Sequence, residues 1–129
     1  MTLNEQEVKS VSKLPPYKRY KYFIKRVADF EEFWTIIDKN KDIALSHIDN
    51  KMLVSFWTAP DFIKSNLNEE WKEYTLFKVD LDNFEDSIMS LIIENNYLIN
   101  VFPVNNKSGF VVNLNEFTRD LNEELNKYS

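Results

Sequence analysis

Apolar side chains recur at the spacing of an α-helix in three stretches of the chain. The first spans residues 15–27 and begins with two prolines, which suit the first turn of a helix. The second spans 82–96, where Asp82 and Glu85 are expected to form a capping box and two asparagines to end the helix. The third spans 114–128. The three apolar faces consist of Tyr17, Tyr20, Phe23, Ile24 and Val27; of Phe84, Ile88, Leu91 and Ile92; and of Phe117, Leu121, Leu125 and Tyr128.

Alternating and continuous apolar runs predict strands elsewhere. Residues 43–58 are expected to form a β-hairpin around Asp49-Asn50, because both residues tolerate a left-handed backbone. This register places His47 opposite Met52, near the turn. The core face of the hairpin then carries Ile43, Leu45, Val54 and Phe56. Further strands are predicted at 75–81, 97–104 and 110–113, and the near-continuous apolar run at 97–104 favours a central position.

The segment 29–38 carries two competing patterns. Phe30, Phe33, Trp34 and Ile37 fit helical spacing, whereas most residues from Phe33 to Ile37 are strand formers. We expect Ala28-Asp29 to end the first helix, Asp29 and Glu32 to cap one helical turn at 29–32, and a strand to follow. The choice between helix and strand for this segment stays open. A short helix to about Leu67 is expected after Ala59-Pro60-Asp61, and residues 68–74 form a polar connection containing Trp71.

These elements predict the α+β class. A chain of 129 residues with 43% hydrophobic residues is long enough for one sizeable core. Residues 1–14 are expected to be a polar N-terminal arm or a short helical turn, and 15–129 a single domain. We expect a central mixed or antiparallel sheet of about five to six strands with about four helices around it. There is no apolar run of membrane-spanning length and no apolar signal-peptide core near the N-terminus, so a cytoplasmic location is expected.

Charge is unevenly distributed. Residues 1–26 hold seven basic and two acidic residues, a net charge of +5, whereas residues 27–129 hold nine basic and 19 acidic residues, a net charge of −10. An acidic body disfavours nucleic acid and anionic membranes and attracts basic partners. The run from Tyr17 to Arg26 interleaves basic and aromatic residues, which superficially suits single-stranded nucleic acid. However, only Tyr22 shares the basic face with Lys18, Arg19, Lys21, Lys25 and Arg26, so a solvated, docking or internally paired face is favoured.

Several landmarks follow one another in a familiar order: Tyr22-Phe23, Val27-Ala28-Asp29, Glu32, Trp34, Phe56-Trp57-Thr58, Trp71, Val79-Asp80-Leu81, Phe84, Val101-Phe102-Pro103 and Gly109-Phe110-Val111-Val112. Over roughly residues 17–125, this order resembles the bacterial domain of unknown function numbered 2750. The second half also resembles, more distantly, the N-terminal domain of the enhanced-serine-sensitivity protein family. The resemblance implies an α+β fold and a bacterial origin. It transfers no catalytic residue, because the family name carries no activity.

The composition excludes several kinds of site. There is no Cys, one Gly and one His, which removes thiolate metal sites, glycine-rich phosphate loops and multi-histidine centres. We therefore expect no catalytic, cofactor-binding or metal-ligating residues and no enzyme activity. His47 is interpreted as a partly exposed histidine at a strand end. A carboxylate-based hydrolase is the enzyme alternative, and it requires two carboxylates that face each other across a cleft.

The remaining candidates form an acidic docking surface. An exposed Trp among charged residues is typical of a binding hot spot, and Trp71 lies among three glutamates. The candidate partner-binding residues are Glu69, Glu70, Trp71, Glu73, Asp80 and Asp86. The favoured function is a small bacterial protein that binds another protein. Its sharpest form is an immunity protein that neutralises a cognate toxin, for which a basic nuclease domain is the expected partner. The alternative is a housekeeping or secretion-accessory protein.

Overall fold

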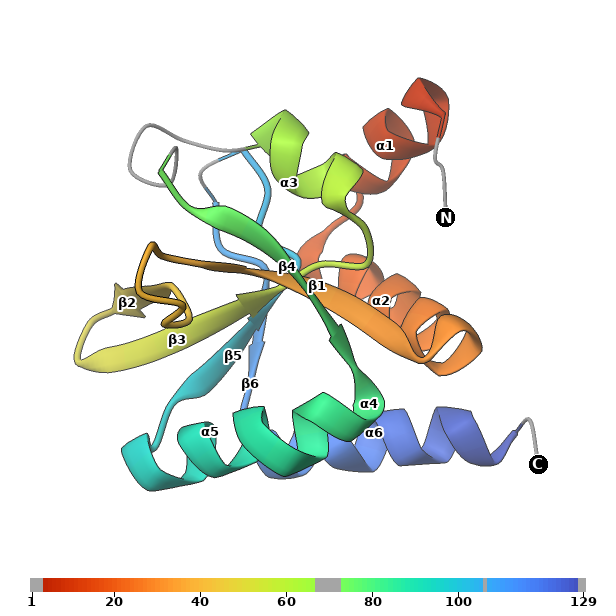
Figure 1. The fold of residues 1–129 in the computed structure, drawn as a ribbon. Coiled ribbons are helices and arrows are strands. Elements are labelled where there is room, and N and C mark those ends of the chain that lie inside the picture. The colour runs from red at the N-terminus through yellow and green to blue at the C-terminus, as the bar shows by residue number, and fades with distance from the viewer. Residues whose placement is uncertain (1–3, 67–72, 106, 128–129) are drawn as a thin grey trace.

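The computed structural model describes residues 4–66, 73–105 and 107–127 and confirms the α+β class (Figure 1). The helices are α1 (Glu5–Ser12), α2 (Pro16–Phe30), α3 (Pro60–Asn66), α4 (Leu81–Asn83), the π-helical segment η2 (Phe84–Ile88), α5 (Met89–Asn95) and α6 (Leu114–Asn126). The strands are β1 (Glu32–Ile37), β2 (Leu45–Ile48), β3 (Lys51–Phe56), β4 (Thr75–Asp80), β5 (Leu98–Val101) and β6 (Phe110–Val112).

The six strands of the described residues form two sheets that backbone hydrogen bonds connect. A four-stranded mixed sheet has the order β2-β3-β5-β6, in which β3 and β5 are parallel and the other pairs are antiparallel. The second sheet is the antiparallel pair β1-β4, which crosses the first (Figure 1). Trp34 and Trp57 exchange backbone hydrogen bonds of 2.7 and 2.9 Å and so connect β1 to the end of β3. A hairpin around Asp49-Asn50 is confirmed, with His47 exposed opposite Met52, but it is shorter than the predicted 43–58. Ile43 lies outside β2 and forms an isolated bridge with Ile37 of β1.

Phenylalanine rings from both sheets and three helical elements form the centre of the core. Phe33 of β1 is fully buried, and four ring centroids lie 4.5–6.4 Å from its own. Such tilted and edge-to-face contacts add to the free energy gained from burial alone. The four neighbours are Phe23 of α2, Phe56 of β3, Phe84 of η2 and Phe117 of α6. Helical periodicity had identified three of these four neighbours, namely Phe23, Phe84 and Phe117.

The boundary between α2 and β1 differs from the prediction. The helix does not end at Ala28-Asp29 but continues to Phe30, and the expected cap formed by Asp29 and Glu32 is absent. Glu31 instead ends the helix in the left-handed conformation (φ 58°), and its N–H donates to the carbonyl of Val27. Residues 32–37 form a strand, which settles the alternative that the pattern left open.

The capping box predicted for Asp82 and Glu85 is also wrong. Asp80 is the N-cap, and its carboxylate accepts a hydrogen bond of 2.8 Å from the N–H of Asn83. The helix therefore begins at Leu81, directly at the end of β4. At the other end, Asn96 adopts the left-handed conformation (φ 55°) and ends α5, as the paired asparagines predict.

The central strand is shorter than the predicted 97–104. β5 ends at Val101, because Phe102 has a left-handed backbone (φ 66°) and leaves the sheet. Arg19, expected on the solvated face of the first helix, is buried at this point, and its Nε donates to the carbonyl of Phe102 across 3.0 Å. Its two Nη atoms donate to the carbonyls of Leu14 and Ser108. The side chain thus connects the start of α2 to the end of β5.

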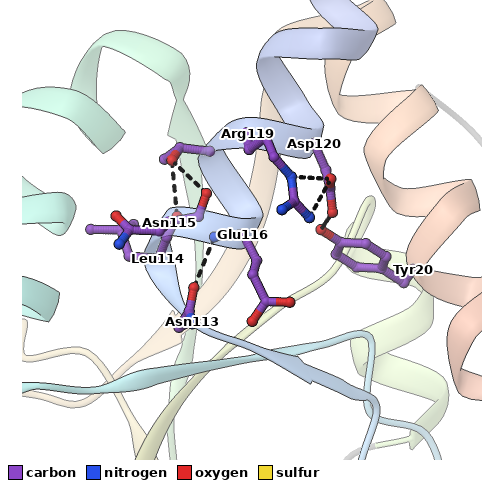
Figure 2. A network of polar contacts seen from close by, with 8 residues as sticks. Tyr20, Asn113, Leu114, Asn115, Glu116, Arg119 and Asp120 are labelled. Atoms are coloured by element: carbon purple, nitrogen blue, oxygen red, sulfur yellow. Dashed lines mark hydrogen bonds and ion pairs between the residues drawn. The ribbon is translucent and has the colours of Figure 1, made fainter.

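Two further contacts hold α2 in place. α1, which forms where an arm or a helical turn was expected, directs Glu7 toward α2, and Tyr22 donates a hydrogen bond of 2.8 Å to its carboxylate. On the other side, the Tyr20 hydroxyl donates across 2.5 Å to Asp120 of α6, which also accepts from Arg119 (Figure 2). Burial, followed by the bond to Asp120, raises the pKa of Tyr20 far above its ordinary value. Helix α2 is therefore held from both sides.

Candidate functional site

Two chain junctions that are far apart in the sequence meet at one end of the β1-β4 pair. The chain passes from α2 into β1 beside the place where it passes from β4 into α4. The register pairs Glu32 with Asp80, and the N–H of Leu81 donates to the carbonyl of Glu31 across 3.3 Å. Figure 1 shows α4 at the foot of β4, next to the end of α2 and the start of β1. The two junctions therefore present one continuous surface.

This surface is rich in carboxylates. All of them are exposed except that of Glu32, which is half-buried, and only Asp80 has its carboxylate engaged in a helix cap. The helical carboxylates lie within about two turns of Asp80, so they are close to the junction along the helix axis. We call the set the acidic junction: Asp29, Glu31 and Glu32 from the first connection, and Asp80, Asp82, Glu85 and Asp86 from the second. Clustered charge of one sign raises the local concentration of oppositely charged partners.

A small pocket of about 100 Å³ lies at the edge of the acidic junction. Helix α2 contributes Arg26 and Phe30, and β1 contributes Glu32 and Trp34. Phe30 is 44% exposed although it is a large aromatic residue, and Trp34 is half-buried. The remaining wall is the turn before α3, with Thr58, Ala59 and Pro60. An aromatic centre with a charged rim is the usual composition of a protein-binding surface.

The polar groups of the pocket differ in whether they already have a hydrogen-bond or ion-pair partner. The Arg26 guanidinium forms an ion pair of 3.1 Å with Glu7 and lies 5.3 Å from the ring centroid of Tyr22. Among the described residues, none forms a hydrogen bond or ion pair with the carboxylate of Glu32. Thr58 is only 6% exposed, and its hydroxyl is buried without a hydrogen-bond partner in the described part of the chain. The pocket therefore offers one unengaged acceptor, the carboxylate of Glu32, while its cation is paired with Glu7.

The structure separates the docking residues expected from the sequence. Glu69, Glu70 and Trp71 lie outside the described residues. Glu73 is exposed just before β4, and Asp80 is at the far end of that strand, roughly 20 Å away. Asp80 and Asp86 join the acidic junction, whereas Glu73 does not. A role for any of these residues in partner binding stays a prediction.

The sequence interpretation missed the contribution of the α2-β1 connection to this surface. Asp29 and Glu32 had been assigned to a capping box, and Glu31 had no assigned role. The local signal was present in five acidic residues near the ends of the paired strands: Asp29, Glu31 and Glu32, and Asp80 and Asp82. These residues lie together because β1 pairs with β4, and the sequence of neither segment alone indicates that pairing.

A second, wider groove of about 490 Å³ lies between α2 and α6. Its α2 side carries Lys21 and Lys25, and its α6 side carries Glu116 and Glu123. At the edge of the groove, the ring of Tyr17, which is 52% exposed, is tilted against the ring of Phe110, with the ring centroids 5.3 Å apart. Since charges of both signs line it and Tyr20 bonds to Asp120 across it, this groove is foremost the seam that joins the two helices (Figure 2).

Other kinds of site have little support in the described ranges. Within residues 4–66, 73–105 and 107–127, no group of three or more His, Asp and Glu residues is arranged to hold a metal ion. His47 is exposed on the β2-β3 hairpin, away from the acidic junction. No helix in the part of the chain that the structure describes is long and apolar enough to cross a membrane.

Comparison with known proteins gives one match. The model of a family described as "Protein of unknown function (DUF2750)" matches residues 20–121. This span contains most of α2, both sheets and the first part of α6, and with them the whole acidic junction and the pocket beside it. No curated protein and no solved structure matches the chain. The more distant resemblance to the enhanced-serine-sensitivity family thus stays a prediction.

Proposed function

The chain belongs to the DUF2750 family, whose description assigns no activity, and we propose that it is a binding protein that docks a basic protein on the acidic junction. The observation that carries the proposal is that two connections, which together hold seven carboxylates, meet beside a pocket lined by exposed Phe30 and half-buried Trp34. Its sharpest form is a cytoplasmic immunity protein that covers a basic nuclease toxin. Exposed carboxylates steer such a partner during encounter, and the aromatic centre then slows its dissociation.

A binding role accounts for this surface better than catalysis does. A hydrolase needs two carboxylates that act as acid and base across a cleft. The nearest approach is the pair Glu32 and Asp80, which the register places opposite each other. The carboxylate of Asp80 already accepts the Asn83 N–H at the start of the helix. The adjoining pocket of about 100 Å³ suits one side chain of a partner rather than a sugar chain. We therefore propose no enzyme activity.

The first experiment reverses the charge of the acidic junction. The variant E31K/E85K/D86K changes three exposed residues, and the control D42K/E94K/E123K changes three exposed carboxylates elsewhere by the same total charge. The partner is the product of the neighbouring gene, and association is followed by stopped-flow fluorescence at 20 mM and 500 mM salt. We expect the junction variant to associate at least about tenfold more slowly at low salt, and the difference to shrink at high salt as exposed charges are screened.

Three outcomes would contradict the proposal. Equal slowing of the control variant would show that net charge matters and position does not. No binding of the neighbouring gene product would remove the immunity function and favour the housekeeping or secretion-accessory alternative. Loss of binding on reversing Lys18, Lys21 and Lys25 of α2, with the junction variant unaffected, would move the docking face to α2. An acidic partner or a nucleic acid would then be favoured.

A further inference from the structure

The pocket beside the acidic junction combines an unpaired carboxylate with aromatic side chains. Glu32, Phe30 and Trp34 line it together. Thr58 also lines the pocket, but its hydroxyl has almost no accessible surface, so a ligand in the pocket does not reach it.

The charges in the pocket favour a cation. Glu32 has no partner among the described groups, and the register places a second carboxylate, Asp80, opposite it. The single cation that lines the pocket, Arg26, is paired with Glu7 at 3.1 Å and stacked against Tyr22. Its repulsion of a second cation is therefore largely offset. An anion would find Arg26 already engaged and would lie beside Glu32, which disfavours it.

We propose that this pocket receives an arginine side chain of the partner protein. This inference rests on the proposed function and names the residue type that anchors the partner. A guanidinium group has only donors, and the pocket supplies an acceptor in the carboxylate of Glu32. Its flat face stacks on aromatic rings, which Trp34 and Phe30 provide. Arginine fits better than lysine because a planar fork bonds a carboxylate through two donors while it stacks.

The Trp34 indole gives a direct readout of this binding. The full chain labelled with ¹⁵N is titrated with N-acetyl-arginine amide, and the shift of the Trp34 indole N–H is followed. N-acetyl-citrulline amide has nearly the same shape without the charge, and N-acetyl-glutamate amide tests an anion. We expect saturable shifts with the arginine amide, at least about tenfold weaker binding of citrulline amide, and no saturation with glutamate amide.

One substitution and a matched control locate the binding group. Glu32→Gln is expected to weaken binding of the arginine amide at least about tenfold, since it removes a charge-assisted hydrogen bond. Asp82→Asn removes an equal charge from the acidic junction outside the pocket and is expected to change binding less than twofold. The backbone amide spectrum of each variant shows whether it is folded.

Equal binding of citrulline and arginine amides, or full binding by folded Glu32→Gln, would overturn the arginine pocket. Saturation by glutamate amide would make it an anion site instead. These results are separable from the docking experiment. If the arginine amide does not bind but E31K/E85K/D86K still slows association with the partner, the proposed function stands and the pocket plays no part in it.

Discussion

Replacing Arg19 with methionine is expected to lower the free energy of unfolding by about 2–4 kcal/mol. The side chain is 4% exposed, and its guanidinium donates to the carbonyls of Phe102, Leu14 and Ser108. Among the described residues, no carboxylate forms an ion pair with it. Its contribution therefore depends on how these hydrogen bonds compare with the cost of burying a charge.

The expected loss of unfolding free energy follows from how deeply the three acceptor carbonyls are buried and how well each is bonded. The Phe102 carbonyl is bonded at 3.0 Å in a buried setting, so leaving it without a donor costs about 1–3 kcal/mol. The bond to Leu14 is part-buried and costs less when lost, while the contact of 3.5 Å to Ser108 contributes little. In the other direction, burial lowers the pKa of Arg19, which shows that the folded environment penalises its charge. Methionine avoids that penalty and keeps most of the apolar stem.

Urea unfolding followed by circular dichroism measures the change. Lys18→Met is the control, because it removes an exposed cation one position away and is expected to stay within about 0.5 kcal/mol. Arg19→Lys is expected to fall between Arg19→Met and the unsubstituted protein, since one ammonium cannot reach all three carbonyls. If Arg19→Met unfolds at the same urea concentration as the unsubstituted protein, the cost of burying the charge cancels the hydrogen bonds, and the reasoning is refuted.

Three further predictions concern Gly109, Tyr22 and His47. Gly109→Ala is expected to cost at least about 2 kcal/mol in urea unfolding, because an added Cβ would lie 1.9 Å from the carbonyl oxygen of Val101; an unchanged midpoint would contradict this. Burial and the bond to Glu7 raise the pKa of Tyr22 from 10.0 to about 12, so its contribution is complete below pH 10 and is lost as pH rises to about 12. Melting temperatures of Tyr22→Phe should therefore fall less over that range than those of the unsubstituted protein, and equal falls would argue against the shift. His47→Ala, at an exposed hairpin position, is expected to change stability by less than about 0.5 kcal/mol and partner binding by less than twofold; loss of binding by a folded variant would reopen the enzyme alternative.

The sequence correctly predicted those elements that are determined by residues close together in the chain. The β2-β3 hairpin follows from Asp49-Asn50 and the alternation on either side, and its four residue pairs have the predicted register. The apolar face of α6 likewise follows from the spacing of Phe117 and Leu121, both of which are buried. In each case the residues that determine the structure are within a few positions of one another, so the sequence alone contains enough information.

The acidic junction is the opposite case, because its cause is non-local. β1 and β4 pair although about forty residues separate them, and the sequence of neither strand indicates its partner. The pairing brings Glu31 and Glu32 beside Asp80 and Asp82, whereas the sequence placed Glu32 and Asp82 in two unrelated capping motifs. Sequence reasoning identified an acidic body and its preference for basic partners. It did not identify where on the surface those charges meet.

Phe102 explains why the strand predicted at 97–104 is longer than β5. The apolar run continues to Val104, yet Phe102 adopts a left-handed backbone, which a bulky side chain rarely does and which costs roughly 1–2 kcal/mol. Three contacts hold it there: its side chain is fully buried, its N–H donates to the carbonyl of Phe56 across 2.8 Å, and its own carbonyl accepts from Arg19. The conformation is therefore imposed by β3 and α2, and residues 97–104 contain no sign of it. The same contacts bury Arg19, so the end of β5 and the loss of one cation from the basic face of α2 have a single cause.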